Sequence, residues 1–260
     1  MNAIRLVVCG AAGRMGASII RLASNDGNFK IAGAVEHGAH PGLGKGEPKL
    51  TADFSAALAG GDVIIDFTTP DATMEHLAVA LKASKAMVIG TTGLSAAQTE
   101  TINAASKKIP IVFSPNFSQG INLLLTIVGK AASVLNGYDV EIVEMHHNKK
   151  KDAPSGTALR LAEVIAQACG KNIKDVGVYG REGQIGARAK GEIGIMSLRG
   201  GDVVGDHTIY FCGSGERIEI THRADSRDTL ACGALTAAKW LHGQKPGLYD
   251  MQDVLGLKAI

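Results

Sequence analysis

The chain has 260 residues, a formal net charge of +2, 45% hydrophobic residues and only 4% aromatic residues. These values are typical of a globular protein with material for one large core or two smaller ones. The small net charge argues against nucleic-acid and membrane-surface partners, and the scarcity of aromatic residues argues against base-stacking platforms. No signal segment opens the chain and no apolar run reaches membrane-spanning length, so we expect a cytoplasmic protein. Its scattered cysteines are expected to be reduced, partly buried thiols: Cys9, Cys169, Cys212 and Cys232.

Short apolar runs alternate with helix patterns through the first half of the chain. The runs predict buried parallel strands at 4–9, 31–35, 63–67, 87–89 and 111–113. Thr69 and Pro70 predict a helix that begins with proline, and Ser95 with Gln98 predicts a capping box. Repeated strand–helix units with short connections predict an α/β fold with a doubly wound parallel, Rossmann-like sheet.

The pattern changes after residue 118. Helices are predicted at 121–135 and 155–169, around a strand at 140–145. Glycines interleaved with apolar residues over 180–215, and a clean alternation over 217–222, predict a sheet with one covered and one polar face. A last helix at about 229–241 is expected to pack back onto the first sheet. We therefore expect a first domain of residues 1–118 plus 228–260, and a second, α+β domain of residues 119–227.

A glycine-rich turn follows the first predicted strand. Gly10, Gly13 and Gly16 open the first helix, where glycines permit a tight turn and the close approach of a pyrophosphate. Glu36 ends the second strand, 20 residues after Gly16, where a carboxylate accepts hydrogen bonds from the ribose hydroxyls of NAD. The pattern predicts a dinucleotide site. A glycine turn without a ligand and an ordinary solvated glutamate are the alternatives.

Polar motifs lie at the carboxyl ends of the later strands, the edge at which open α/β sheets bind ligands. Asp66-Phe67-Thr68-Thr69-Pro70 and Gly90-Thr91-Thr92-Gly93 are placed to line the nicotinamide half of a dinucleotide site. Ser114-Pro115-Asn116-Phe117 follows the next strand, where the two domains are expected to meet. Structural turns are the alternative for each motif.

Residues 144–158 carry the most informative chemistry in the chain. They leave an alternating strand, present two imidazoles and three ammonium groups, and reach a Pro-Ser-Gly-Thr turn that opens a helix. Cationic donors beside the bare N–H groups of a helix start suit a small polyanion. A lysine crowded by other cations also releases its proton more readily than free lysine. The segment predicts a site that binds carboxylates and delivers a proton beside them.

The residues of this segment also fit other interpretations. Lys149–Lys151 fits a solvated charge run, and Glu144 with His146 offers two metal donors on one strand face. No further ligand set completes a metal site, so no metal is expected. Ser155 fits a helix N-cap, since no G-x-S-x-G elbow surrounds it. Three further histidines have no partner visible in the sequence and are expected to be structural, with His207 in Gly-Asp-His-Thr as the exception: His76, His207 and His222.

These motifs occur together, and in the same order, in one known family. The chain carries Gly-Ala-Ala-Gly-Arg-Met-Gly, Asp-Phe-Thr-Thr-Pro, Gly-Thr-Thr-Gly, Pro-Asn-Phe-Ser, His-His-Asn-Lys-Lys-Lys-Asp-Ala-Pro-Ser-Gly-Thr-Ala, Gly-Asp-His-Thr and Glu-Arg-Ile-Glu-Ile-Thr-His. It resembles the 4-hydroxy-tetrahydrodipicolinate reductases (dihydrodipicolinate reductases) over nearly its whole length. The resemblance implies reduction of 4-hydroxy-tetrahydrodipicolinate, a cyclic imine dicarboxylate, to tetrahydrodipicolinate by NADH or NADPH. Water is lost in this step of lysine and diaminopimelate biosynthesis.

The resemblance also implies roles for individual residues. His146 would be the catalytic acid/base, and Lys150, three residues after the second histidine, would be the proton donor. The substrate carboxylate would be bound by His147, Ser155, Gly156 and Thr157. The cofactor would be held by Gly10, Ala11, Ala12, Gly13, Arg14, Met15, Glu36, His37, Phe67, Gly90, Thr91, Thr92, Ser114, Pro115, Asn116 and Phe117. The second domain would bind substrate and assemble a homotetramer through its sheets.

One departure from the family pattern bears on cofactor choice. Several members place arginine directly after the acidic residue of the second strand, where this chain has His37, and Thr69 stands where some members have arginine. Glu36 accepts ribose hydroxyls and repels a 2′-phosphate, so we expect NADH to be preferred. The alternatives are another two-domain NAD-dependent amino-acid or semialdehyde dehydrogenase, which the Pro-Ser-Gly-Thr segment disfavours, and a nicotinamide sensor, for which no binding module is evident.

Overall fold

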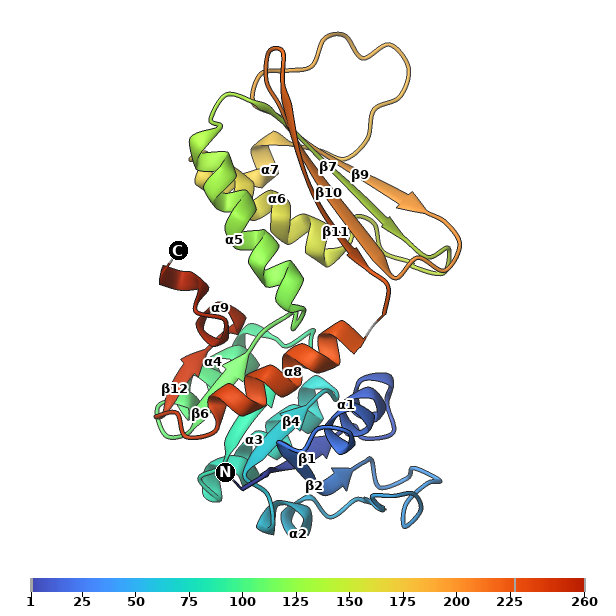
Figure 1. Cartoon of the computed structure of the whole chain (residues 1–260), viewed down its shortest axis with the longest axis vertical. Coiled ribbons are helices and arrows are strands. Elements are labelled where there is room, and N and C mark those ends of the chain that lie inside the picture. The colour runs from blue at the N-terminus through green and yellow to red at the C-terminus, as the bar shows by residue number, and fades with distance from the viewer. Residues whose placement is uncertain (1, 227, 260) are drawn as a thin grey trace. The chain divides into compact units, whose positions relative to one another are not determined.

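A computed structural model describes residues 2–226 and 228–259, and these fold into two compact units (Figure 1). Unit 1 comprises Met1–Gln119 and Asp228–Ile260, and unit 2 comprises Gly120–Arg227. Each unit is built on its own sheet and its own hydrophobic core. No helix of the described ranges is long and apolar enough to cross a membrane.

Unit 1 contains a parallel sheet. Its strands are β1 (Ile4–Cys9), β2 (Phe29–Val35), β3 (Leu50–Thr51), β4 (Val63–Asp66), β5 (Ala86–Ile89), β6 (Pro110–Phe113) and β12 (Gly247–Tyr249). They lie in the order β12-β6-β5-β4-β1-β2-β3, and every neighbouring pair is parallel. The chain reverses its direction of winding at β1, as in doubly wound dinucleotide-binding folds. The predicted Rossmann-like sheet is confirmed.

Helices cover both faces of this sheet. One face packs against α1 (Arg14–Ser24) and α8 (Asp228–Leu241), and the other against α2 (Phe54–Ala59), α3 (Pro70–Lys82) and α4 (Ala96–Ser106). Along β1, Leu6 and Val8 point into the core beneath α1 and α8, whereas Val7 points into the core beneath α2, α3 and α4. Because both faces are covered, the strands appear in the sequence as continuous apolar runs. The packing of α8 on this sheet is as predicted.

Proline and capping residues mark the starts of two helices, as predicted, but the shortest elements were not predicted. Pro70 is the first residue of α3, and the capping box of Ser95 and Gln98 begins α4, both as predicted. The chain does not close with α8. It continues through β12, α9 (Met251–Val254) and the 3₁₀ turn η1 (Leu257–Ala259). These elements, together with β3 and α2, are too short to show a hydrophobic period.

Unit 2 has a mixed sheet, as the predicted α+β character requires. Its strands are β7 (Asp139–His146), β8 (Gly177–Val178), β9 (Ile193–Arg199), β10 (Gly205–Cys212) and β11 (Arg217–Ala224), in the order β11-β10-β7-β9-β8. β10 runs antiparallel to β7 and β11, whereas β7, β9 and β8 are parallel. Its helices are α5 (Gln119–Val134), α6 (Gly156–Ala168) and the short α7 (Ile173–Val176).

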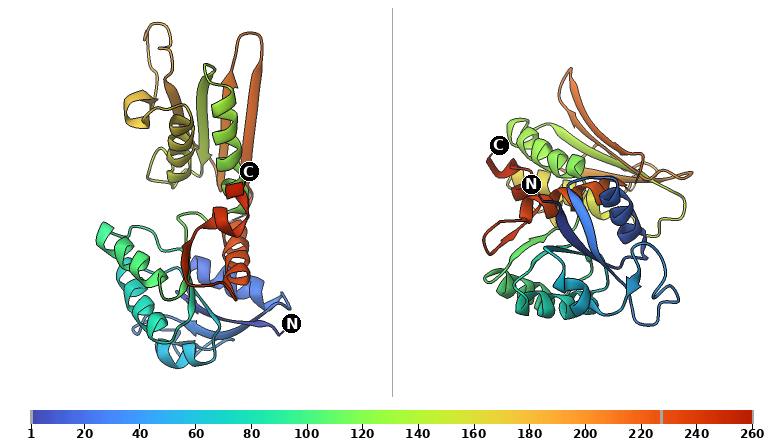
Figure 2. Two further views of the ribbon diagram at one scale, coloured as in Figure 1. Left: turned by 90° about the vertical axis from the view of Figure 1, so that its left-hand side faces the viewer. Right: turned by 60° about the horizontal axis from the view of Figure 1, so that its bottom comes forward.

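The two faces of this sheet differ. One is covered by α5 and α6 and carries the unit's core, including Ile142 and Phe211 (Figures 1 and 2). We expected the opposite face to be polar, but part of it is apolar. On adjacent strands Val143 pairs with Met196, and Met145 pairs with Leu198, which is 48% exposed; these four residues are named the apolar stripe. Simple alternation hid the stripe because both faces of β7 and β9 carry apolar residues.

Candidate functional site

The turn between β1 and α1 requires its glycines. Gly10 has φ +74°, and a Cβ there would lie 2.6 Å from the carbonyl oxygen of Phe67 at the end of β4. A Cβ at Gly16 would overlap the carbonyl of Gly10. The first glycine therefore permits a left-handed turn against β4, and the last lets α1 pack directly on that turn.

Glu36 lies at the end of β2 with its carboxylate directed at this turn. The N–H of Ala12 donates to Oε2 at 2.9 Å, and the N–H of His37 donates to Oε1 at 3.0 Å. His37 itself is exposed. The acidic residue and the glycine turn, which are far apart in the sequence, are thus in direct contact, as the dinucleotide prediction requires.

A pocket of about 660 Å³ opens beside the turn in unit 1. The predicted cofactor residues among its lining are Gly10, Ala12, Gly13, Glu36, His37 and Phe67. Three others from the same turn do not line it. Ala11 is buried, Met15 packs against the core, and Arg14 is exposed.

The remaining predicted cofactor residues follow β5 and β6. A Cβ at Gly90 would overlap the ring of Phe67, and Thr91 Oγ1 accepts the N–H of Thr68 at 3.1 Å. The strand ends of β4 and β5 are therefore packed side by side, as the parallel sheet predicts. Thr92 is exposed at the start of the following loop.

After β6, the motif 114–117 forms a compact turn. Ser114 Oγ donates to the carbonyl of Asn116 at 2.9 Å, and Pro115 is exposed. The ring of Phe117 stacks edge-on against Phe67 at 5.4 Å and is only 2% exposed. Phe117 thus supports the pocket-lining Phe67 from within the core.

A buried polar group beside the pocket was not predicted. Asp66 is fully buried, and its Oδ2 lies 2.6 Å from Nδ1 of His76. Its Oδ1 accepts the hydroxyls of Thr68, Thr73 and Thr91. Cys9 completes a group of potential metal ligands within 4.8 Å of one another. Burial, with the nearby charges of Asp66 and Glu36, raises the pKa of the Cys9 thiol well above its usual range, so the thiol keeps its proton.

In unit 2, the three lysines of the segment that joins β7 to α6 differ in their exposure to solvent. Lys149 and Lys151 are exposed, whereas Lys150 is half-buried. The Nζ of Lys150 donates to both carboxylate oxygens of Asp152, at 2.9 and 3.0 Å. Its nearest partner is therefore an anion, rather than the crowd of cations that we expected.

The start of α6 presents its backbone N–H groups at the same segment. Ser155 is the N-cap, and its Oγ accepts the N–H of Ala158 at 3.1 Å, as predicted. Gly156 is exposed and Thr157 is half-buried in the first turn, where N–H groups have no acceptor within the helix. The positive end of the helix dipole adds to this attraction for an anion. The backbone of His147 is fixed by a 2.7 Å hydrogen bond to Val203.

His146, the last residue of β7, is held by a buried carboxylate. Its Nδ1 lies 2.6 Å from Oε2 of Glu144, which is fully buried. Arg199 of β9 binds both oxygens of Glu144, at 2.8 and 2.9 Å. Burial alone would raise the pKa of Glu144, but hydrogen bonds from Arg199, His146 and Ser197 lower that pKa to about 2. Glu144 is therefore an anion at neutral pH.

His207 of β10 lies beside both His146 and Ser155. Its Nε2 is 3.1 Å from Ser155 Oγ, and its ring centroid is 5.3 Å from that of His146. Burial, followed by the neighbouring His146, lowers the pKa of His207 to about 4, so the ring is neutral at pH 7. His222, its partner on β11, also has a pKa lowered by burial.

Sequence reasoning found the histidines and lysine of this site but not their support. Glu144 was noticed only as a possible metal ligand, although it falls on the buried face of an alternating strand, where an anion needs a partner. Arg199 comes from β9 and gave no signal. In chemical terms, the site combines an imidazole held by a carboxylate, an ammonium group and a helix start that attracts anions.

Comparisons with known proteins point to one family. The model for the N-terminus of dihydrodipicolinate reductase matches residues 4–117, and the model for its C-terminus matches residues 120–255. A 4-hydroxy-tetrahydrodipicolinate reductase from Anaeromyxobacter dehalogenans is 51% identical, over 98% of this chain and 98% of its own. One from Nitrosomonas eutropha is 50% identical, over 99% of this chain and 100% of its own. The dipicolinate-bound dihydrodipicolinate reductase from Paenisporosarcina sp. TG-14 has a TM-score of 0.79 and 25% identity, over 96% of this chain and 98% of that one.

Proposed function

The chain belongs to the dihydrodipicolinate reductase family, and we propose that it reduces 4-hydroxy-tetrahydrodipicolinate to tetrahydrodipicolinate in lysine and diaminopimelate biosynthesis. NADH or NADPH supplies a hydride to the ring, one proton is taken up, and the 4-hydroxyl group leaves as water. About 50% identity to reductases of this name spans nearly the whole chain. The match of both family models leaves the alternative dehydrogenase without support.

One arrangement in unit 2 carries the proposal at the level of chemistry. His146, Lys150 and the start of α6 lie on one short segment, and a buried anion holds the histidine. The relative from Paenisporosarcina is described as dipicolinate-bound, and dipicolinate shares two ring carboxylates with the proposed substrate. A dianion of this size suits a site that offers an ammonium group and a helix N-terminus.

We assign roles to these groups on that basis. His146 acts as the acid/base and Lys150 as the proton donor, a contribution typically worth 10²–10⁴ in rate, or about 3–5 kcal/mol. The half-burial of Lys150, against the exposure of its two neighbours, supports this choice among the lysines. The substrate carboxylate is bound by His147, Ser155, Gly156 and Thr157.

Unit 1 is proposed to bind the cofactor at its pocket. Glu36 accepts the ribose hydroxyls in place of the N–H groups that it now holds, and the glycine turn approaches the pyrophosphate. The described pocket lining includes histidines but neither lysine nor arginine, so a 2′-phosphate meets no permanent cation there. We therefore propose that NADH is the preferred cofactor. The turns after β5 and β6 hold the nicotinamide half.

We also propose that the protein is a homotetramer assembled through unit 2. The apolar stripe of Val143, Met145, Met196 and Leu198 lies on the sheet face opposite α5 and α6. An exposed apolar patch on a sheet face is typical of an interaction surface. Pairing of this face with its equivalent in another copy would cover the stripe.

Steady-state turnover tests the proposed function directly. NADH absorbance should fall on addition of the chain only when freshly generated 4-hydroxy-tetrahydrodipicolinate is present, and tetrahydrodipicolinate should accumulate in equal amount. Amino acids and semialdehydes serve as control substrates for the alternative dehydrogenase. Oxidation of NADH with those compounds, and not with the dicarboxylate, would refute the proposal.

A further inference from the structure

We infer that Glu144 and Arg199 act as a positioning pair, which keeps the proton of neutral His146 on Nδ1 and leaves Nε2 as its working nitrogen. The inference deepens the proposed function and rests on it, because it takes His146 as the acid/base. All of these residues belong to unit 2. Neither Glu144 nor Arg199 needs to touch substrate for this role, since both act through His146 and the backbone around it.

The tautomer follows from the chemistry of the carboxylate. His146 Nδ1 and Glu144 Oε2 are 2.6 Å apart, and the carboxylate is ionised, with a pKa of about 2. An ionised carboxylate only accepts hydrogen bonds, so Nδ1 must be the donor. In neutral imidazole the proton then resides on Nδ1, and Nε2 keeps its lone pair for proton transfer.

The surroundings of Nε2 agree with this assignment. Gly205, at the start of β10, faces the ring, and a Cβ there would lie 3.0 Å from Nε2. The φ of Gly205 is not in the left-handed region, so its backbone does not demand glycine. Glycine instead lets the ring of His146 lie close to β10 without a side chain pressing on Nε2, the nitrogen that the tautomer argument selects.

Arg199 stabilises the buried carboxylate of Glu144 and connects it to the loop that carries Lys150. Its guanidinium binds both oxygens of Glu144 and donates to the carbonyl of Asp152 at 2.7 Å. Asp152 in turn holds Lys150 through its carboxylate. The same Glu144 accepts the N–H of Ser155, the N-cap of α6, at 3.2 Å. The pair therefore joins the acid/base, the lysine loop and the anion-binding helix start.

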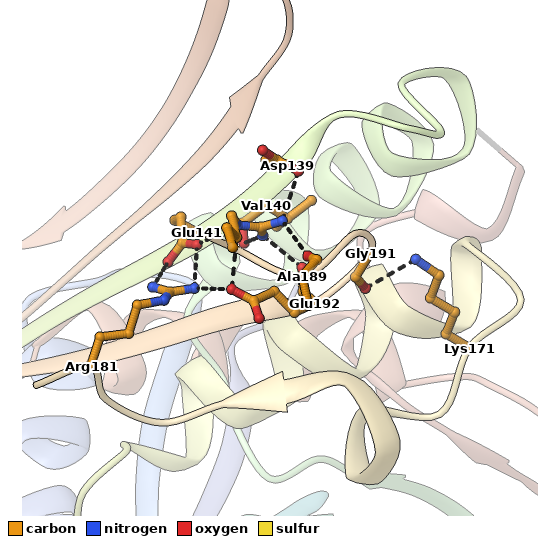
Figure 3. A network of polar contacts seen from close by, with 9 residues as sticks. Asp139, Val140, Glu141, Lys171, Arg181, Ala189, Gly191 and Glu192 are labelled. Carbon is orange, nitrogen blue, oxygen red and sulfur yellow. Dashed lines mark hydrogen bonds and ion pairs between the residues drawn. The ribbon is translucent and has the colours of Figure 1, made fainter. Parts of the chain in front are cut away.

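The same strand provides a matched control. Glu141 of β7 is likewise paired with arginine, in this case with two: Arg181 donates to its carboxylate at 2.8 and 2.9 Å, and Arg188 at 3.0 Å. Figure 3 shows this network, in which Arg181 also reaches Glu192. Glu141 lies on the face of β7 opposite Glu144, by strand alternation. Glu141→Gln thus removes an arginine-paired carboxylate from the same strand without touching His146.

Nitrogen-15 NMR of the histidine rings is the primary test. In the unmodified protein, long-range proton–nitrogen correlations should show the neutral ring of His146 protonated at Nδ1 and unprotonated at Nε2. An Nε2–H tautomer would overturn the inference. This readout needs no turnover, so it stands apart from failure of the proposed function, which would appear as inactivity of the unmodified chain.

Substitution tests the positioning role. In Glu144→Gln the amide can donate to Nδ1, so a population of the Nε2–H tautomer should appear, with a fall in kcat of roughly 10²–10⁴-fold and unchanged NADH affinity. Glu144→Asp, which keeps the charge, should restore Nδ1–H, and Glu141→Gln should leave the tautomer unchanged. A Glu144→Gln protein with unaltered tautomer and rate would contradict the role.

The pH–rate profile separates positioning from simple support of the fold. The charged and titratable groups around His146 are Glu144 on its own strand, Arg199 on β9, His207 on β10, and Lys150 and Asp152 in the following loop. Loss of the anion removes the partner of Nδ1, so the pH–rate profile should change in Glu144→Gln. It should stay in place in Glu141→Gln. Equal profiles for both variants would mean that Glu144 only supports the sheet. If Glu144→Gln does not fold, the tautomer of His146 in the unmodified protein decides the inference.

Discussion

At the scale of single residues, Glu36 is the residue that we propose to distinguish the two nicotinamide cofactors. Its carboxylate already contacts the glycine turn, so it lies close to any ribose bound there. At ~5 Å and an effective dielectric near 20, a unit charge on a 2′-phosphate would interact with it by about 3 kcal/mol before screening. Solvent and salt reduce this considerably, because the pocket is open. NADH is therefore the expected cofactor.

His37→Arg should shift preference toward NADPH. The exposed residue next to Glu36 lines the pocket, and a permanent cation there would attract the 2′-phosphate. The measurement is kcat/KM for both cofactors, in the variant and in the unmodified protein. His37→Gln, which adds no cation, is the control. A strong NADPH preference in the unmodified protein would contradict the assignment of Glu36.

His207 predicts how stability depends on pH. Its pKa is about 4 in the folded protein, below the 6.5 of an ordinary histidine, so the unfolded chain binds the proton first. Stability should therefore fall as pH drops from about 6.5 to 4, by up to roughly 3 kcal/mol. Glu144, with a pKa of about 2, loses its own stabilising effect only at lower pH.

Urea unfolding at several pH values checks this. His207→Asn should flatten the decline between pH 6.5 and 4, although His222, whose pKa is also lowered, keeps a part of it. Substitution of the exposed His37 by Gln should leave the decline unchanged. A flat profile in the unmodified protein would show that His207 is not buried as a neutral ring.

The sequence indicated the candidate reacting groups more clearly than the residues that hold them. His146, Lys150 and Ser155 stand in a motif whose spacing is visible. Arg199 could not be found, because it meets Glu144 only through the pairing of β7 with β9. Asp66 and His76 likewise meet only through the fold. Buried polar partners come from distant elements, so local patterns do not reveal them.

At the scale of elements, the start of α6 is capped by Ser155 and is also the proposed carboxylate site. Ser155→Ala removes an N-cap and should cost about 1 kcal/mol of stability. Ser95→Ala at α4 removes a comparable cap in unit 1 and should cost a similar amount. Only Ser155→Ala should raise KM for the dicarboxylate, because α6 is the helix proposed to bind it. Equal effects of both variants on KM would contradict an anion site at α6.

Long, periodic elements were predictable and very short ones were not. Both faces of the first sheet are covered, so its strands are visible in the sequence as apolar runs. Helix α8 is visible because it has a continuous apolar face. β12 has three residues and is defined by its pairing with β6. The apolar stripe was missed for a different reason, since a strand apolar on both faces shows no alternation.

At the scale of the whole molecule, the apolar stripe predicts assembly. Leu198→Asp places a charge on the sheet face proposed to pair, so the tetramer should dissociate into smaller species. Leu248→Asp alters an exposed apolar residue of β12 in unit 1 and should leave assembly intact. Analytical ultracentrifugation of both variants decides. A monomeric unmodified protein, or equal dissociation of both variants, would refute assembly through the stripe.

The central claim is that the β7–α6 segment of unit 2 contains the reacting groups, and Lys150 tests it most directly. Lys150→Ala should lower kcat for 4-hydroxy-tetrahydrodipicolinate at least about 100-fold, with little change in NADH binding, because the lysine acts on substrate. Lys149→Ala and Lys151→Ala remove the same charge from exposed positions and should have mild effects. Equal losses in all three variants would mean that the segment is only a diffuse positive field, and the assigned roles would be wrong.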